Sequence, residues 1–303
     1  MQKVLISGSS GLIGTALSTA LTTQGERVST LVRPGSRGAH EPGAVRWDPG
    51  RDRVDAAALE GFDAVVHLAG ENLVSGRWTD DKKRRIVNSR VGGTQLLSSA
   101  LATTGARPRV LISASAVGFY GNRGDEWLDE SSPPGTGFLA DLCTRWEAAA
   151  TPAEEAGIRV VNVRFGVVLA SSGGALRRML TPFRLGLGGS LGGGRQFMSW
   201  ITLEDAVRTV LRAMEDEHLV GPVNAVAPTP VRNVAFTRSL GRVIRRPTLA
   251  AVPAAALRLA LGPMADELLL ASQRVRPARL QSAGFKFSHP ELESALRSVV
   301  GSD

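Results

Sequence analysis

The stretch KVLISGSSGLIGTAL, residues 3–17, decides the fold. Lys3–Ser7 has the apolar run of a short buried strand, and helical apolar spacing begins at Leu12. Between them, Gly8 allows a tight turn, Gly11 lets the backbone approach an anion, and Gly14 lets the helix pack closely on a sheet. The free N–H groups and the dipole at the start of the helix would then hold a dinucleotide diphosphate. The predicted contacts are Gly8, Ser9, Ser10, Gly11, Leu12, Ile13 and Gly14.

Strand and helix signals alternate over the first half of the chain. This alternation predicts a doubly wound parallel sheet of the Rossmann type, in the α/β class. The predicted strands are 3–7, 27–32, 63–68, 109–113, 158–164 and 222–225. The predicted helices are 12–23, 80–104, 138–157 and 203–215.

The organisation changes after Ser171, where glycine becomes dense over 186–194. The tail from Pro228 to Ser302 has mostly helical spacing broken by prolines. We therefore expect a cofactor domain over 1–170, free to recruit strands from 195–225. A smaller, mostly helical substrate lobe over 171–303 would include a C-terminal helical domain at about 250–300.

Composition narrows the class of protein. The net charge of +8 comes from arginine, and no basic run is longer than Lys82–Arg85, which favours a small-molecule partner over nucleic acid. With one cysteine and four scattered histidines we predict no metal. Apolar stretches such as 250–261 are too short and broken to span a bilayer, and no signal peptide pattern is present, so we expect a cytoplasmic protein without a membrane partner. The sequence leaves a homodimer open.

The end of the second predicted strand bears on the choice between NAD and NADP. An acidic residue there would bind the ribose 2′-hydroxyl, but this chain reads Leu31-Val32-Arg33-Pro34-Gly35-Ser36-Arg37. A guanidinium pairs with a 2′-phosphate, whereas a carboxylate repels it. Arg33, helped by Ser36 and Arg37, therefore predicts NADP(H), with a solvated loop arginine as the alternative reading.

Further segments resemble the extended short-chain dehydrogenase/reductase family, whose glycine spacing is also GxxGxxG. They are Asp63–Gly70, Ser113–Gly121, Val163–Leu169 and Arg195–Ile201 followed by Glu204-Asp205-Ala206. The resemblance implies cofactor contacts from Leu68, Ala69, Gly70, Ser113, Ala114, Arg164, Phe165 and Gly166. It also implies a substrate site that includes Arg195, Gln196 and Trp200, to which we add Glu71. Trp200 filling the core is the alternative, and Arg77 with Trp78 forms a second candidate wall.

Within this family the chain resembles a subgroup of NAD-dependent epimerases/dehydratases with a C-terminal domain of unknown function. Members carry labels such as cell division inhibitor or nucleoside-diphosphate-sugar epimerase. The matching segments are Gly76–Thr79, Ser89-Arg90, Trp146-Glu147, Met264–Leu269, Gly284-Phe285 and His289-Pro290. The subgroup implies a carbonyl compound or nucleotide sugar as substrate, without fixing a reaction.

The family's Tyr-x-x-x-Lys pair is missing. If Glu147 matches the family's helix glutamate, Leu139 occupies the tyrosine position and Cys143 the lysine position. Neither side chain can act as the lysine-activated phenolate that exchanges a proton during hydride transfer.

Ser115 and Tyr120 are therefore the catalytic candidates. Ser115 either hydrogen-bonds the substrate or satisfies the turn backbone, and Tyr120 is either a proton donor or a half-buried aromatic. Glu147 is either an acid/base or a salt-bridged carboxylate, and Cys143 is either a reactive thiol or an inert one. Two functions follow: an NADP-dependent oxidoreductase or epimerase with a non-standard acid/base, or a catalytically silent NADP(H)-binding sensor or interaction protein.

Overall fold

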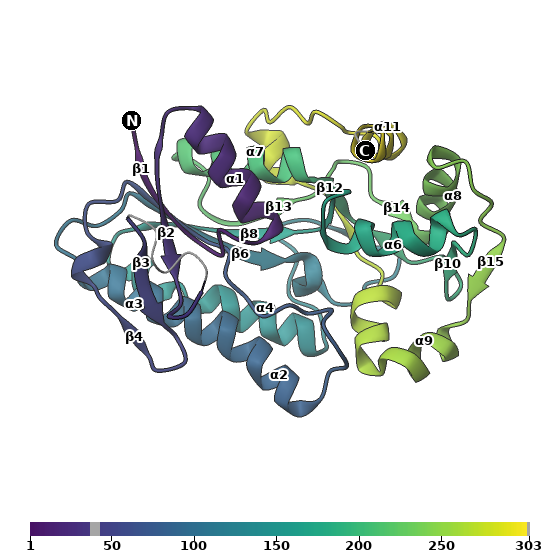
Figure 1. Cartoon of the computed structure of the whole chain (residues 1–303), viewed down its shortest axis with the longest axis horizontal. Coiled ribbons are helices and arrows are strands. Elements are labelled where there is room, and N and C mark those ends of the chain that lie inside the picture. Colours follow the sequence, from purple (N-terminus) through teal and green to yellow (C-terminus); the bar gives the residue numbers. More distant parts are fainter. Residues whose placement is uncertain (37–42, 302–303) are drawn as a thin grey trace.

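The computed structural model describes residues 1–36 and 43–301, and these residues form an α/β fold around one large sheet (Figure 1). Eight strands pair in the order β13-β8-β6-β5-β1-β2-β3-β4, all parallel except β4 against β3. Their bounds are β1 Lys3–Ser7, β2 Arg27–Val32, β3 Val45–Asp48, β4 Arg53–Val54, β5 Ala64–His67, β6 Val110–Ala116, β8 Arg159–Phe165 and β13 Gly221–Ala225. The predicted doubly wound parallel sheet is confirmed.

Helices cover both faces of the sheet, so its central strands are apolar on both sides. On one face lie α1 (Leu12–Thr23) and α7 (Leu203–Glu215), which pack Leu17 and Val210 into the core. On the other face lie α3 (Gly93–Thr103) and α5 (Thr151–Glu155), with α4 (Phe138–Ala148) beside them. Figure 1 shows α1 and α7 above the sheet and α3 and α4 below it.

The sequence predicted the bounds of β1, β2, α1 and α7 residue for residue. The predicted long helix over 80–104 is α2 (Asp80–Val87), a π-helical turn (Asn88–Gly92) and α3. The predicted helix over 138–157 instead divides at Ala149 and Ala150 into α4 and α5. β3 and β4 were not predicted, since they are short and follow a loop rich in proline and glycine.

Segments after Leu169 pair with strands of the first half of the chain. β13 completes the large sheet by pairing in parallel with β8. Four separate two-stranded pairs form among the described residues, and two of them join a strand after residue 170 to a strand before it. The other strands are β7 Trp127–Leu128, β9 Val167–Leu169, β10 Gly189–Leu191, β11 Phe197–Met198, β12 Trp200–Thr202, β14 Val231–Arg232, β15 Ala250–Val252 and β16 Arg274–Val275. The other helices are α6 Gly174–Arg184, α8 Asn233–Val243, α9 Ala254–Leu261, α10 Ala278–Ser282 and α11 Leu292–Val300, with single turns at 57–59 and 117–120 and a π-helical segment at 265–270.

Among the described residues, none of the helices combines the length and the apolar character that crossing a bilayer requires.

Candidate cofactor and substrate site

Two adjoining cavities lie where the parallel strands β1, β5, β6 and β8 end, which is where α/β sheets bind ligands. The reaction cavity, as we name the larger one, has a volume of about 420 Å³, and the adenosine cavity has about 260 Å³. Both are lined by Gly8, Gly11 and Leu68, so the glycine loop forms a shared border. The two cavities therefore adjoin at the glycine loop before α1.

The glycine loop is shaped by close backbone contacts. Gly8 has φ +70°, and a Cβ there would lie 2.8 Å from the backbone of Leu68 and Ala69. A Cβ on Gly14 would lie 2.2 Å from the carbonyl oxygen of Gly8. Gly11 N–H donates to that same oxygen at 2.9 Å, which closes the turn before α1. Larger side chains at these positions would push the loop away from the helix start that a diphosphate needs.

The adenosine cavity contains several predicted cofactor residues. Arg33 lies exposed at its wall, and Ser36 Oγ donates to the Arg33 carbonyl at 2.8 Å. Ser9, Ser10, Ala69 and Gly70 also line it. The predicted helper Arg37 lies outside the described residues.

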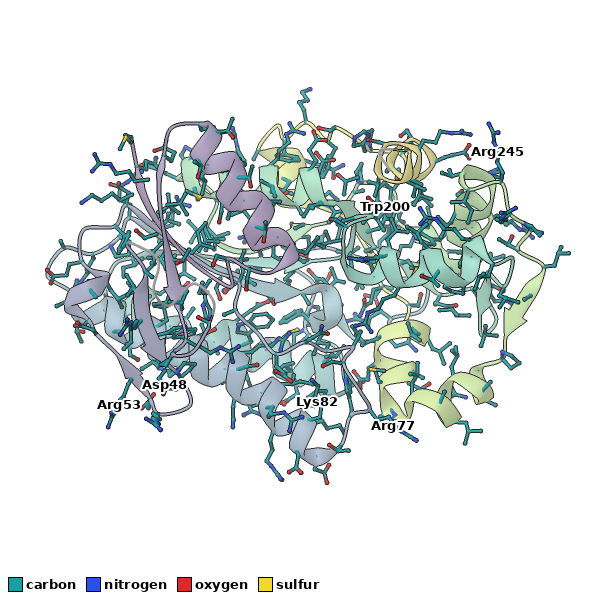
Figure 2. The ribbon with its side chains drawn as sticks, in the orientation of Figure 1. Asp48, Arg53, Arg77, Lys82, Trp200 and Arg245 are labelled. Atoms are coloured by element: carbon teal, nitrogen blue, oxygen red, sulfur yellow. The ribbon has the colours of Figure 1, made fainter. Side chains whose placement is uncertain are left out.

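Glu71 lines the adenosine cavity and not the reaction cavity, so the structure does not place this predicted substrate residue beside Ser115. Lys82 Nζ donates to Glu71 Oε1 at 2.6 Å, and Arg85 Nε lies 3.8 Å from the same oxygen. The hydrogen bond from Lys82 lowers the pKa of Glu71, helped by the charges of Lys82, Arg85 and Arg33. Figure 2 shows Lys82 on α2. These cations compensate the carboxylate at a site where it would otherwise repel a phosphate.

The wall of the reaction cavity is largely apolar. Leu12, Ile13 and Gly14 line it from α1, Ala114 and Ser115 from β6, and Phe165 and Gly166 from the end of β8. Ser113 is fully buried in the sheet and lines neither cavity, which corrects its prediction as a cofactor contact.

Helix α4 contributes Leu139, Leu142, Cys143 and Trp146 to the same cavity. Leu139 and Cys143, which stand at the family's tyrosine and lysine positions, both lie against Gly118. Burial, and then the charge of Glu147, raise the pKa of Cys143 to about 12, so the thiol keeps its proton. A protonated thiol is a poor nucleophile, which favours the inert reading of Cys143.

A buried polar network lies behind this wall. Ser115 Oγ donates to Glu147 Oε1 at 2.6 Å, and Arg164 binds both carboxylate oxygens of Glu147 at 2.7 Å. Arg164 Nη1 also donates to Tyr120 Oη at 3.0 Å, and Tyr120 donates to Asn224 Oδ1 at 2.8 Å. The side chain of Arg164 thus makes its hydrogen bonds to Glu147 and Tyr120 behind the wall. The next two residues along the chain, Phe165 and Gly166, line the cavity.

Tyr120 is fully buried and does not line the reaction cavity, which corrects its prediction as a catalytic residue. Burial raises its pKa to about 12, and the hydroxyl is saturated by Arg164 and Asn224. The structure therefore fits the alternative prediction, in which Tyr120 is a packed aromatic residue, and the side chain is fully buried instead of half-buried.

Three predicted substrate residues lie away from both cavities. Trp200 is fully buried, with its Nε1 donating to the Thr229 carbonyl, and Figure 2 shows it inside the C-terminal half. Gln196 is buried and donates to two backbone carbonyls, while Arg195 is exposed at the surface. These placements correct the prediction of a substrate wall over 195–200.

The second candidate wall also fails to reach the cavities. Trp78 packs against Phe138 in the core, and Arg77 is exposed on the surface, as Figure 2 shows. Neither lines the reaction cavity, because the Trp78 indole N–H is directed to the Leu73 carbonyl at 2.8 Å.

Sequence reasoning about the site missed Arg90. This arginine is 8% exposed, lines the reaction cavity and lies over the Trp146 ring at 5.1 Å. Its Nη1 donates to the Glu71 carbonyl at 3.0 Å, and within the described chain no carboxylate lies within ion-pair distance. Burial lowers its pKa, so the folded chain bears a cost that an anion in the cavity would offset. The Ser89-Arg90 match to the subgroup was the available signal.

Sequence reasoning also missed three cavity residues from the C-terminal segment, namely Glu267, Leu268 and Gln273. Glu267 accepts hydrogen bonds from the backbone N–H groups of Phe138 and Leu139 at 2.9 and 3.1 Å, and so caps α4. The C-terminal segment therefore closes one side of the reaction cavity. The resemblance of Met264–Leu269 to the subgroup singled out this segment, but it did not indicate that the segment contacts the start of α4.

Two family models match the chain. The NAD dependent epimerase/dehydratase family matches residues 4–225, and a domain of unknown function, DUF1731, matches residues 252–299. The chain belongs to the NAD dependent epimerase/dehydratase family. The predicted resemblance to the subgroup with this C-terminal domain is confirmed.

Relatives extend over nearly the whole chain. An epimerase family protein of Mycobacterium bovis is 47% identical over 97% of this chain and 96% of its own length. Human epimerase family protein SDR39U1 is 37% identical over 98% of this chain and 99% of its own. The crystal structure of human SDR39U1 (isoform 2) with NADPH aligns with a TM-score of 0.91 and 35% identity, covering 99% of this chain and 100% of that one.

Proposed function

We propose that this epimerase-family chain binds NADP(H) across its two cavities and acts on a small substrate as an oxidoreductase or epimerase with a non-standard acid/base. The observation that carries the proposal is the shared border of the cavities at Gly8 and Gly11, with Arg33 in the wall of one cavity and Ser115 in the wall of the other. The structural similarity to human SDR39U1, a protein crystallised with NADPH, supports it.

The residues present fit this cofactor. The start of α1 has no acidic side chain in its first turn, so its free N–H groups are available to a diphosphate. Arg33 lines the adenosine cavity and would pair with a 2′-phosphate, and the described residues 31–36 at the end of β2 include no carboxylate. Buried Arg90 adds a positive charge on the side of the reaction cavity. When bound, NADP(H) supplies or accepts the hydride.

The chain's own residues then determine what happens at the reacting end. The apolar wall of Leu139, Leu142 and Phe165 excludes water from the cavity, which strengthens the few polar interactions inside it. Ser115 is the catalytic candidate that faces this space, and residues 171–303 form the substrate lobe by contributing Glu267 and Gln273. We propose that the substrate is small, a carbonyl compound or alcohol, because the cavity must also hold part of the cofactor.

A second function is favoured by the absence of the family's tyrosine and lysine pair. Leu139 and Cys143 line the cavity at the positions where the family carries tyrosine and lysine, and Tyr120 lies behind the wall. A chain that binds NADP(H) without turnover, as a sensor or interaction protein, is consistent with this arrangement. A homodimer and a cytoplasmic location stay predictions, which sedimentation and fractionation would test.

Calorimetry tests the cofactor proposal. The full chain should bind NADPH more tightly than NADH, and Arg33→Ala should weaken NADPH binding by about tenfold or more while changing NADH binding little. Arg53→Ala is a matched control, because Arg53 is exposed on β4 and lines neither cavity. Figure 2 shows it at the edge of the molecule. Uptake of neither nucleotide by folded protein would refute the proposal.

Turnover separates the two functions. NADPH absorbance is followed with a panel of carbonyl compounds, and NADP⁺ reduction with the corresponding alcohols. Nucleotide sugars are followed by NMR for a change of configuration, because epimerisation leaves the cofactor absorbance unchanged. An enzyme should give turnover that falls on Ser115→Ala. Tight NADPH binding with no turnover over the whole panel would support the sensor.

A further inference from the structure

The direction of one hydrogen bond determines what Ser115 can offer a ligand. Ser115 is 3% exposed, lies in β6 and lines the reaction cavity. Its hydroxyl donates to Glu147 Oε1 at 2.6 Å, and Glu147 does not line the cavity. A serine hydroxyl has one proton and two lone pairs, so a proton given to Glu147 is not available to a ligand.

Glu147 also accepts hydrogen bonds from a cation. Arg164 binds it with a two-pronged geometry, Nε to Oε1 and Nη2 to Oε2, each at 2.7 Å. The Glu147 and Arg164 side chains are only 11% and 4% exposed, so water competes little for them. Charge-assisted hydrogen bonds of this length are roughly twice as strong as neutral ones. The Ser115 hydroxyl therefore keeps its hydrogen bond to the carboxylate and does not turn its proton toward a ligand.

We propose that Ser115 faces the reaction cavity as a hydrogen-bond acceptor and selects a substrate group that donates, namely the hydroxyl of a small alcohol. The inference rests on the proposed function, since the cofactor must share this cavity. A carbonyl oxygen at the same place would bring lone pairs against lone pairs and gain no hydrogen bond. Glu147 and Arg164 act as positioning residues, because they fix the polarity of Ser115 from behind the wall.

Three other polar side chains of the cavity do not replace Ser115 in this role. Cys143 is a protonated thiol and at most a weak donor. Glu267 has both oxygens bound to the start of α4, and Arg90 donates to the Glu71 carbonyl. Gln273 alone in the described lining carries an amide that can donate or accept, and it belongs to the C-terminal segment.

Matched alcohol and ketone pairs on one carbon skeleton test the proposal, starting with cyclohexanol and cyclohexanone and continuing to larger rings. Dissociation constants are measured by ligand-observed NMR on the full chain saturated with NADP⁺, with which the ketone does not react, and the alcohol spectra are recorded before any oxidation to the ketone is detected. We expect the alcohol to bind about tenfold more tightly, the effect of one hydrogen bond made or lost. Equal or tighter ketone binding in every pair, or no binding by any pair, overturns the proposal.

Three variants test the assignment to Ser115. Ser115→Ala should bring the two dissociation constants of a pair to within about twofold, and Ser115→Thr should keep the preference. Glu147→Gln should weaken the preference, because the neutral amide offers one oxygen, shared by Ser115 and Arg164, and holds the hydroxyl proton less tightly. A purely structural role of Glu147 would weaken both ligands together. Ser131→Ala is the control, since exposed Ser131 donates to Asp129 on the surface.

The outcomes separate this inference from the proposed function. Absence of NADP⁺ binding by calorimetry refutes the proposed function, whereas NADP⁺ binding without an alcohol preference refutes only the role of Ser115. If Ser115→Ala weakens NADP⁺ about tenfold and leaves the alcohol-to-ketone ratio unchanged, the donor is the cofactor's own amide, and the substrate assignment is wrong. If Glu147→Gln does not fold, the Ser115→Ala and Ser115→Thr ratios decide.

Discussion

Glu267 accepts the backbone N–H of Phe138 at 2.9 Å, across 129 residues of sequence. Its second carboxylate oxygen accepts the N–H of Leu139 at 3.1 Å. α4 therefore has its N-terminal cap in the C-terminal segment, and Gly137 before it has φ +108°. A Cβ on Gly137 would lie 2.6 Å from Glu267 Oε1, so the glycine makes room for the carboxylate.

Replacing this cap should destabilise the whole fold. Glu267→Ala should lower the free energy of unfolding by about 1–2 kcal/mol, because two N–H groups lose their acceptor and the helix dipole loses an anion. Urea denaturation measures the change. Asp266→Ala is the control, since Asp266 pairs with Arg258 on the surface and should change stability little. Equal effects of the two substitutions would contradict the capping role.

Arg90→Met should separate stability from cofactor binding. Removing a buried cation that lacks a carboxylate partner should leave the ligand-free chain as stable as the wild type or more so, since methionine keeps contact with Trp146. NADPH binding should weaken by about tenfold or more if the cation faces a bound anion. Thermal unfolding with and without NADPH measures both, and exposed Arg77→Met serves as control. Unchanged NADPH affinity would exclude Arg90 from the cofactor site.

Gly14→Ala should disrupt the glycine loop. The new methyl group would lie 2.2 Å from the carbonyl oxygen of Gly8, so the backbone must move. We expect a loss of about 1–3 kcal/mol in unfolding free energy and at least tenfold weaker NADPH binding. Gly193→Ala is the matched control, because a Cβ there meets nothing within 4 Å. Wild-type NADPH affinity in Gly14→Ala, measured by calorimetry, would contradict the role of the loop.

His67 should make stability depend on pH. Burial lowers its pKa from 6.5 to about 4, so between these values the unfolded chain binds a proton that the folded chain does not. The contribution of neutral His67 to the free energy of unfolding is complete above pH 6.5. It is lost as the pH falls, and the loss reaches about 3 kcal/mol near pH 4. Urea unfolding of wild type and His67→Gln should show the steeper decline in the wild type. His218→Gln, at an exposed position, should keep the wild-type slope, and equal slopes for His67→Gln would refute the prediction.

Local sequence predicted the parts of the site that local geometry determines. The strand, glycine turn and helix over 3–23 lie in one continuous segment, and Gly8, Gly11 and Gly14 meet one another there. Arg33 follows β2 directly, so its place beside the cofactor loop follows from strand pairing.

The rest depended on side-chain direction and on contacts over long sequence separations. Tyr120 and Trp200 stand in segments that pass near the cavity, but each side chain points into the core instead. Sequence spacing does not reveal which side of an irregular turn a side chain takes. Glu267 could not be assigned either, because its partners are the backbone groups of Phe138 and Leu139, which any residues at those positions would offer.

The cap on α4 also couples two distant parts of the chain mechanically. Glu267 anchors the end of the helix that carries Leu139, and both residues line the reaction cavity. A displacement of residues 265–270 would therefore move this wall without any change in the other side chains of the lining. Substitutions in the C-terminal segment can in this way alter ligand preference from a distance.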